Sequence, residues 1–278
     1  TWVNWWNRVT PILSSQPRKT RARKLTSPVN SVDFTANFIH LSKHLIMSEK
    51  KEQALNEIKN SFSEMAGLVL RQLTLLEKLM GTGDEDTFNS LISEMDVAEN
   101  RIDNLEVVIG EQFTSTIVLF QPVASDVRRL VAIYRMTVNL ERIGDRIHNL
   151  CRIIGTIRNT TEYASTSSLI GNMLASGSIM VEKALLSFTN SDPDYAIWTI
   201  KNDTVVDEMN HKLLLGHLRR ENIDDKTRSM VQSYIELKDM ISNIERIADH
   251  ATNIAEAAIY SLQGTDIRHT GIGKEETF

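Results

Sequence analysis

Residues 141–149 read ERIGDRIHN, and residues 245–253 read ERIADHATN. The two stretches share Glu, Arg, Ile, Asp and Asn at matching places, and each matching pair is separated by 104 residues. Similarity at a fixed period indicates a duplicated supersecondary unit. A second set of acids obeys the same offset: Glu99, Asp103, Asp203 and Asp207. The sequence therefore predicts two related halves.

Apolar residues outside the N-terminal region recur at steps of three and four, which is the period of an amphipathic helix. The pattern is clearest near the end of the chain, at Ile241, Ile244, Ala248, Ala251, Ala255, Ala258 and Leu262. Three of the five prolines lie within residues 1–28, so long helices can fill the remainder. No alternation with period two is sustained, and the predicted fold class is all-α.

Breaks in the helical pattern divide the chain into segments. The predicted helices are one that ends at Gly81, then about 88–113, one from Pro122 to about 154, 166–188, 194–219 and 225–262, with Gly264 as the final stop. Three helices joined by short turns form an antiparallel bundle. We therefore expect two tandem three-helix bundles, at 49–160 and 161–264, with an N-terminal segment 1–48 and a tail 265–278.

The N-terminal segment differs from the rest in composition. It contains three tryptophans and then five basic residues: Trp2, Trp5, Trp6, Arg18, Lys19, Arg21, Arg23 and Lys24. Tryptophan beside clustered base is typical of a membrane–water interface, and a basic linker whose tryptophans dock on the bundle is an equal alternative. A short amphipathic helix is expected to follow, with Phe34, Phe38, Leu41 and Leu45 on one face.

The composition excludes several classes of protein. A net charge of −5 over 278 residues gives no global attraction to nucleic acid, which is not expected as a partner. The lone Cys151 excludes an intramolecular disulfide, fits a reducing compartment and is expected to pack in the core. No apolar run is expected to approach the roughly 18 residues that span a bilayer. We expect a soluble, cytoplasmic chain.

The duplicated acids are the candidate functional groups. Two carboxylates at positions i and i+4 of a helix share one face and repel each other. Any single pair is best interpreted as a solvated face, but each half has such pairs on two helices, and Asn149 and Asn253 extend the rows. Four acids that meet between facing helices would be held together by a divalent cation.

The ligand chemistry limits which metal such a cluster would take. Oxygen ligands suit magnesium, manganese, calcium or iron, whereas structural zinc is disfavoured because neither cysteine nor paired histidine is at hand. Arg142 and Arg246, next to the acids, offer an alternative in which a salt-bridge network replaces the metal.

Catalysis has little support in the sequence, and no catalytic residue or organic cofactor is predicted. A di-iron oxidase needs two Glu-x-x-His pairs, and the chain has one, from Glu208 to His211. His148 and His250 are interpreted as surface or structural groups. No Gly-rich phosphate loop or nucleophile elbow is present. A metal-dependent hydrolase or oxidase is the rival class.

At residues 141–149 and 245–256 the sequence resembles the PhoU family, regulators of phosphate uptake built from two three-helix bundles. The lead-in QPVASDVR at 121–128 and the closing GTDIRH at 264–269 fit the same family. The resemblance covers about residues 50 to 270.

The resemblance implies multinuclear metal clusters, with iron first and zinc, manganese or magnesium as alternatives. The residues that it implies, together with the two asparagines, are Glu99, Asp103, Glu141, Asp145 and Asn149 for one half and Asp203, Asp207, Glu245, Asp249, Asn253 and Glu256 for the other. Glu256 has Arg152 as its counterpart, so the first site is expected to bind metal more weakly or to bind fewer ions.

The implied partners are a membrane phosphate transporter, upstream in the same chain or separate, a sensor kinase, and a second copy of the chain as a homodimer. The fifty residues before the first bundle, and a first residue other than Met, resemble the cytosolic extension of sodium/phosphate cotransporters. The main expectation is thus the metal-binding regulatory part of such a cotransporter, at the inner face of the membrane. The alternative is a stand-alone PhoU regulator of a phosphate ABC transporter and its sensor kinase.

Overall fold

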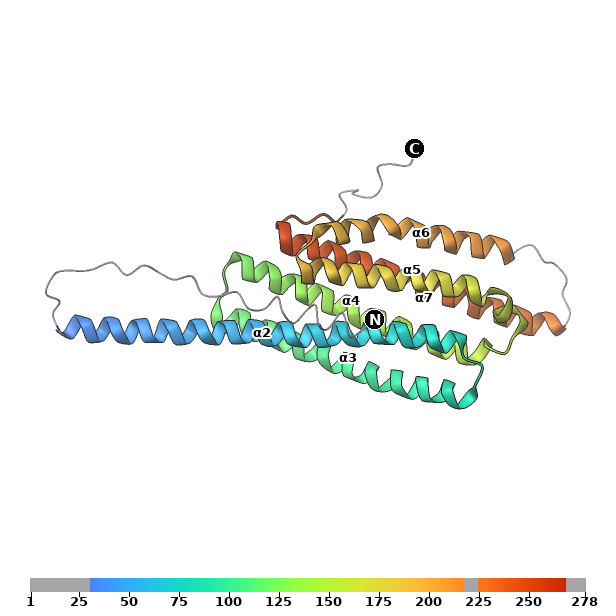
Figure 1. The fold of residues 1–278 in the computed structure, drawn as a ribbon, viewed down its shortest axis with the longest axis horizontal. Coiled ribbons are helices and arrows are strands. Elements are labelled where there is room, and N and C mark those ends of the chain that lie inside the picture. Colours follow the sequence, from blue (N-terminus) through green and yellow to red (C-terminus); the bar gives the residue numbers. More distant parts are fainter. Residues whose placement is uncertain (1–30, 218–224, 269–278) are drawn as a thin grey trace, which may run out of the picture. The chain divides into compact units, whose positions relative to one another are not determined.

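The computed structural model describes residues 31–217 and 225–268, with side chains described in 46–209 and 231–268. Within these ranges the chain forms helices and no strand, which confirms the all-α prediction (Figure 1). The helices are α2 (Ser31–Gly81), α3 (Glu85–Phe120), α4 (Ala124–Ile157), α5 (Thr161–Asn190), α6 (Pro193–His217) and α7 (Asp225–Gln263). The stretch rich in tryptophan and base lies outside the described residues.

The helix ends follow the local sequence. Asp84 caps α3, because its carboxylate accepts a hydrogen bond from the Thr87 amide at 2.8 Å. Gln121 ends α3 in the left-handed conformation, with φ of 43°, directly before Pro122. Gly264 has φ of 75° and follows the last residue of α7, as predicted.

Helix α2 continues through the point at which the sequence analysis expected a short helix to give way to the first bundle. It contains no proline, so nothing in its backbone forces a break. The chain forms two compact units, Thr1–Glu52 and Gln53–Phe278. Both acid-bearing halves lie in the second unit, and the predicted domain bounds remain a prediction.

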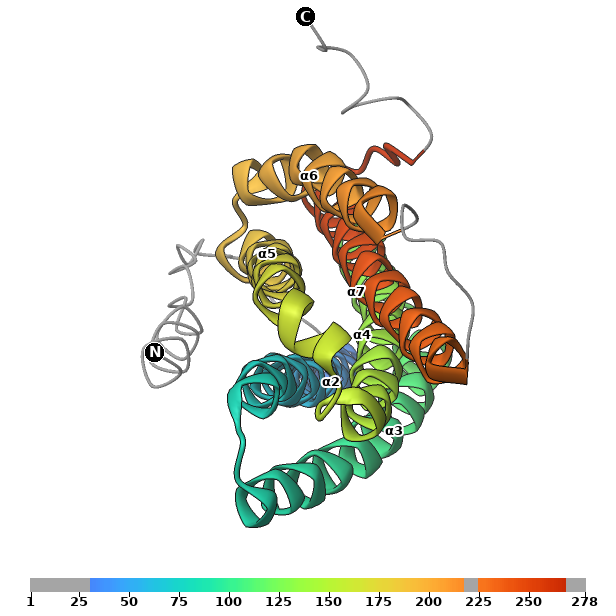
Figure 2. The ribbon, with the colours of Figure 1, turned by 90° about the vertical axis from the view of Figure 1, so that its right-hand side faces the viewer.

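The second unit is built from six helices that include the C-terminal part of α2. Helix α3 packs on α4. Helices α5 and α6 pack on each other and on α7, and α4 lies along α7 (Figure 2). Helix α2 contacts both groups, since Gln72 bonds to Met95 of α3 and Phe62 meets the ring of Phe188 of α5 edge-on at 5.7 Å. The contact between α4 and α7 thus joins the two related halves.

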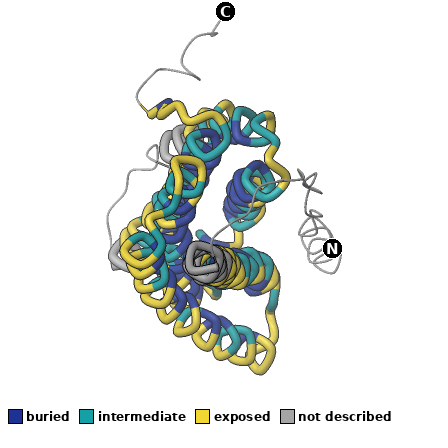
Figure 3. The backbone as a smooth tube through the Cα atoms, turned by 90° about the vertical axis from the view of Figure 1, so that its left-hand side faces the viewer, coloured by how far each residue is buried: buried dark blue, intermediate teal, exposed yellow. Residues whose placement is uncertain are grey.

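Buried residues recur along the helices (Figure 3), and most of them are apolar. Leu140 and Ile147 of α4 and Ile244 and Ile254 of α7 are fully buried. Cys151 is buried in the same core, and its burial, followed by the charges of Asp96 and Glu99, raises the pKa of the thiol to about 12. A thiol in this state is not a nucleophile, which confirms its packing role.

Helix α5 corrects the expectation that no segment is apolar enough to span a membrane. In the described part of the chain, Thr161–Asn190 passes that test by length and composition. Its apolar side chains, including Ile170, Leu174, Val181 and Leu185, are fully buried against the other helices. A core helix of a soluble bundle has the same composition, because it is covered on most sides by protein.

Candidate metal centres: two acid clusters

The first acid cluster lies between α3 and α4. Glu99 comes from α3 and its carboxylate rests on the backbone of α4, where a Cβ added to Gly144 would stand 2.8 Å from Glu99 Oε2. Burial raises the pKa of Glu99, and the charges of Asp103 and Asp145 raise it further. The structure therefore brings these three predicted residues together.

Glu141, the fourth predicted acid of this half, belongs to the same group. Its pKa is raised to about 7, first by burial and then by the negative charges of Asp145, Glu106 and Asp103. Glu106 was missed by the sequence analysis, although it lies three residues beyond Asp103 on the same face of α3. Its counterpart in the second half would be Asn210, so a search for duplicated acids could not find it.

Gln72 is a second residue that the sequence analysis missed. It lies on α2, is 1% exposed, and its Nε2 donates hydrogen bonds to Glu99 Oε2 at 3.0 Å and to the Met95 carbonyl at 3.2 Å. The bond to Glu99 opposes the rise in that residue's pKa. A glutamine between Val69 and Leu73 in an apolar stripe is the signal that would have revealed it.

The second acid cluster lies between α6 and α7 and repeats the first. The pKa of Asp203 is raised to about 6 by burial, and then by the charges of Asp249, Asp207 and Glu245. Burial and the charge of Asp207 also raise the pKa of Asp249, while Arg246 lowers it. All four acids predicted for the second half thus interact.

Two of the three remaining predicted ligands have described surroundings. Asn253 donates from Nδ2 to Asn139 Oδ1 of α4 at 3.3 Å. Glu256 lines a pocket of about 230 Å³ between α4 and α7, together with Arg135 and Arg268. Asn149 is half-buried on α4. A ligand role for these three residues remains a prediction, and for Asn253 and Glu256 the contacts described are with other groups.

Arg142 and Arg246 form no ion pair with the acids in the described part of the chain. They lower the pKa of Glu141 and Asp249 through their charge. Ion pairs of the described ranges such as Arg71–Glu94, Arg101–Glu64 and Arg158–Glu85 lie outside both clusters. These two arginines therefore do not supply the salt-bridge alternative to metal.

The clusters fit a metal by chemistry, and less so by their present geometry. Carboxylate oxygens are the ligands that hard divalent cations prefer. No three His, Cys, Asp or Glu side chains converge on one point within 46–209 and 231–268. The carboxylates would therefore have to turn toward a common centre, and Glu99 would have to leave Gln72.

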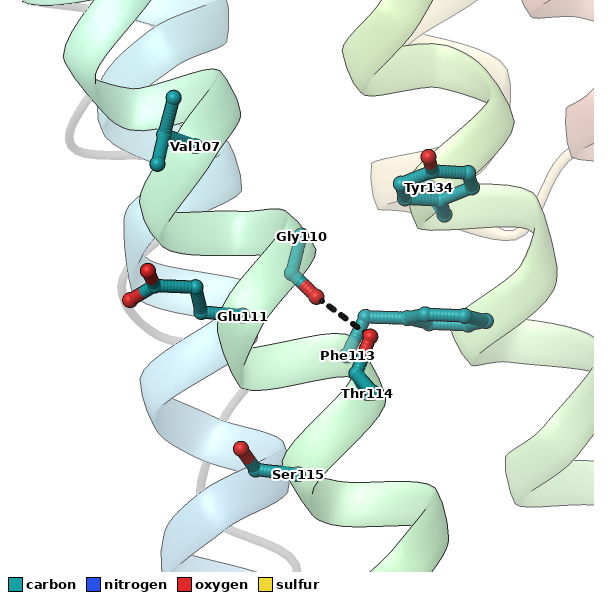
Figure 4. A pocket seen from close by; sticks show the side chains of 7 residues that line it. All are labelled: Val107, Gly110, Glu111, Phe113, Thr114, Ser115 and Tyr134. Carbon is teal, nitrogen blue, oxygen red and sulfur yellow. Dashed lines mark hydrogen bonds between the residues drawn. The ribbon is translucent and has the colours of Figure 1, made fainter.

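A separate hollow of about 670 Å³ lies between α3 and α4 (Figure 4). Phe113 and Tyr134 stack across it with ring centroids 4.9 Å apart, and the Thr114 hydroxyl donates to the Gly110 carbonyl at 3.0 Å. Glu111 is the one acid in its lining. This hollow is therefore distinct from the acid clusters.

The two clusters coincide with a recognised repeat. A family model described as the PhoU domain matches residues 62–154 and again residues 170–258. The chain belongs to the PhoU family. Each copy of the PhoU domain contains one acid cluster, so the predicted duplication and the resemblance to this family are confirmed.

Curated PhoU relatives extend over most of the chain. A phosphate-specific transport system accessory protein PhoU homolog of Burkholderia sp is 30% identical over 236 residues, which cover 82% of this chain and 94% of that protein. The phosphate-specific transport system accessory protein PhoU of Escherichia coli K12 is 27% identical and is covered over 92% of its length. This chain therefore matches nearly the whole length of both relatives.

Solved PhoU structures share the fold. The crystal structure of PhoU from Pseudomonas aeruginosa superposes with a TM-score of 0.62 at 24% identity, covering 77% of this chain and 99% of that one. The phosphate transport system regulatory protein PhoU from Streptococcus pneumoniae gives a TM-score of 0.60 at 19% identity, with coverage of 78% and 98%. At these identities the similarity concerns the fold alone.

Proposed function

We propose that this chain is a non-catalytic PhoU regulator that acts on a phosphate transport system at the cytoplasmic face of the membrane. The observation that carries the proposal is the double PhoU domain, whose curated relatives are named accessory proteins of phosphate-specific transport. A sensor kinase and a second copy of the chain are further proposed partners.

The partner is proposed to be a separate transporter. The relatives are matched over 92–94% of their own length, and their names describe accessory proteins. These findings support the alternative reading of the sequence better than the main one. The cotransporter reading is retained as a second candidate because of the tryptophans and bases of the N-terminal segment. The gene sequence upstream of Thr1 separates the two, since several apolar helices there would favour a cotransporter.

The two acid clusters are proposed to bind divalent or trivalent metal ions, with iron first and zinc, manganese or magnesium as alternatives. Burial, and then mutual repulsion, raise the pKa of Glu141 and Asp203, and a bound cation would remove that repulsion. Glu99, Asp103, Glu141 and Asp145 would hold the ions of the first half, and Asp203, Asp207, Glu245 and Asp249 those of the second. The metal would have a structural role: it would stabilise the clusters without taking part in a reaction.

Elemental analysis of the full chain tests metal binding. The Asp145→Ala, Asp249→Ala double variant should carry no more metal than a blank, while Asp239→Ala, which removes an exposed acid of α7, should keep the metal content of the parent. A metal-free parent after growth and dialysis in each candidate metal would end the metal proposal.

Phosphate uptake tests the regulatory role. In a bacterial strain that lacks its own PhoU protein, expression of the chain should restore control of uptake by external phosphate, and the double variant should restore it less. If uptake stays uncontrolled with a folded parent protein, the regulatory proposal fails.

A further inference from the structure

Helices α4 and α7 pack in opposite directions about a centre that relates the two halves. Asn139 contacts His250 and Asn253, and further toward the start of α4 Arg135 lies over the ring of Tyr260 at 5.0 Å. The two helices therefore run antiparallel. From the facing pair Asn139 and Asn253, five residues forward on α4 and five back on α7 lead to Gly144 and Ala248. These two are 104 residues apart, so they mark the level along the helices about which the two halves are related.

The helix faces that meet around this centre are basic. Stepping from Asn139 by three and then four residues gives Arg142 and Arg146, which share its face of α4. Stepping back from Asn253 by three and then four gives His250 and Arg246 on α7. We call Arg142, Arg146, Arg246 and His250 the basic seam. Under the offset, Arg142 corresponds to Arg246, and Arg146 corresponds to His250.

The duplicated motif separates its charges between two faces. The acids Glu141 and Asp145 act on the cluster with α3. His250, which is 9% exposed, lies in the α4–α7 contact, where its ring meets Asn139. Arg142 and Arg146 of one half and Arg246 of the other all lie near enough to this histidine to act on it through their charge.

The seam has unused hydrogen-bond donors. Arg146 Nε is buried and has no hydrogen-bond partner, and Arg142 and Arg246 are exposed. His250 is fixed by Asn139, whose Oδ1 accepts from Nδ1 at 3.0 Å. At the neighbouring end of the interface, Asp266 forms ion pairs with Arg268 at 2.6 Å and with Arg135 at 3.5 Å. A buried donor without a partner is costly, and a small anion would satisfy it.

We propose that the basic seam between α4 and α7 binds a small divalent oxyanion of the phosphate class, held by Arg142, Arg146 and Arg246. Planar guanidinium groups donate paired hydrogen bonds that match phosphate oxygens. The anion would bridge the two PhoU domains and so act on their packing. The inference rests on the proposed function for its biological role, whereas its chemistry depends on the seam alone.

Isothermal titration calorimetry with inorganic phosphate tests this inference on the full chain. Protein treated with EDTA, in chloride buffer of constant ionic strength, should bind one phosphate with a Kd below about 1 mM. Arg146→Gln and Arg246→Gln should each weaken binding at least roughly ten-fold, since each removes a charged donor. Arg152→Gln is the matched control, because it removes an exposed arginine of α4 outside the seam.

The outcomes separate the sources of the anion. Binding of free phosphate assigns the seam to a soluble ion, whereas binding only to vesicles that contain phosphatidic acid, lost in the same variants, assigns it to a lipid headgroup. If a variant does not fold, the test is whether phosphate at fixed ionic strength raises the melting temperature of the parent protein. Absence of binding in every arm, or equal weakening by Arg152→Gln, overturns the inference. Metal content measured on the same samples is independent, so either proposal can fail alone.

Discussion

Replacing Gly144 by alanine should disturb the first acid cluster, because Glu99 occupies the space that the new Cβ needs. The Cβ would stand 2.8 Å from Oε2 and 3.3 Å from Oε1 of Glu99. A contact this short requires the carboxylate to move, and we expect it to lose its 3.0 Å bond with Gln72. In the second half the corresponding residues are Ala248 and Asp203, and Asp203 is one methylene shorter than Glu99.

The magnitude follows from two opposed effects. Alanine in a helix interior is favoured over glycine by about 1 kcal/mol, whereas losing a hydrogen bond to a charged group costs roughly 1.5–3 kcal/mol. Gly144→Ala should therefore lower the free energy of unfolding by about 0.5–2 kcal/mol, from the difference of these values. Gly155→Ala on the same helix should raise it by up to about 1 kcal/mol, since its Cβ would meet only Phe88 Cζ at 3.8 Å.

Urea unfolding of EDTA-treated protein, followed by circular dichroism, measures both variants. Adding Glu99→Asp to Gly144→Ala recreates the pair found in the second half and should recover stability, with a coupling energy of about 1–2 kcal/mol in the double-mutant cycle. If Gly144→Ala stabilises the protein as much as Gly155→Ala does, the close approach of Glu99 is not a property of the fold.

Three further predictions concern the clusters and the core. In metal-free protein the pKa is raised to about 7 for Glu141 and to about 6 for Asp203, so the folded state holds protons that the unfolded state has released. The free energy of unfolding should therefore fall as pH rises from about 4 to 7. The double variant Glu141→Gln, Asp203→Asn should reduce this fall by no more than about 1 kcal/mol, because both carboxylates are partly solvated. A slope unchanged in thermal melts of the double variant would assign it to other groups. Metal at 100 times its Kd should raise the free energy of unfolding by about 2.7 kcal/mol and EDTA should reverse this; an unchanged melting temperature with every candidate metal contradicts it. Leu140→Ala, at a fully buried position of α4, should cost about 2–4 kcal/mol in urea unfolding, and a cost below 1 kcal/mol would contradict the packing of α4 in the core.

Much of the fold could be predicted because helical period and stop signals are local properties of the chain. Pro122, Pro193 and Gly264 each lie beside a helix end, as expected. The continuity of α2 could not be predicted from an amphipathic pattern that changes character near residue 48. The apolar run in α5 was overlooked because its serines and glycines interrupt the strongly apolar residues without adding charge.

The site was predictable where it is duplicated and not elsewhere. The eight clustered acids follow from the 104-residue offset, which requires no coordinates. Gln72 and Glu106 have no acidic counterpart in the other half, so only the packing of α2 and α3 reveals them. The facing of Arg146 and Arg246 likewise depends on the register of α4 against α7, which a single sequence does not contain.

Gly144 and Ala248 occupy the same place in the two halves, and this has a consequence for divergence. In a symmetric pair of identical subunits, any substitution at such a place is made in both copies. In one continuous chain the two places are encoded separately, so one half can change alone. Glycine in the half with the longer acid and alanine in the half with the shorter acid are such a difference, and the two acid clusters of one molecule can therefore differ in the space around their acids.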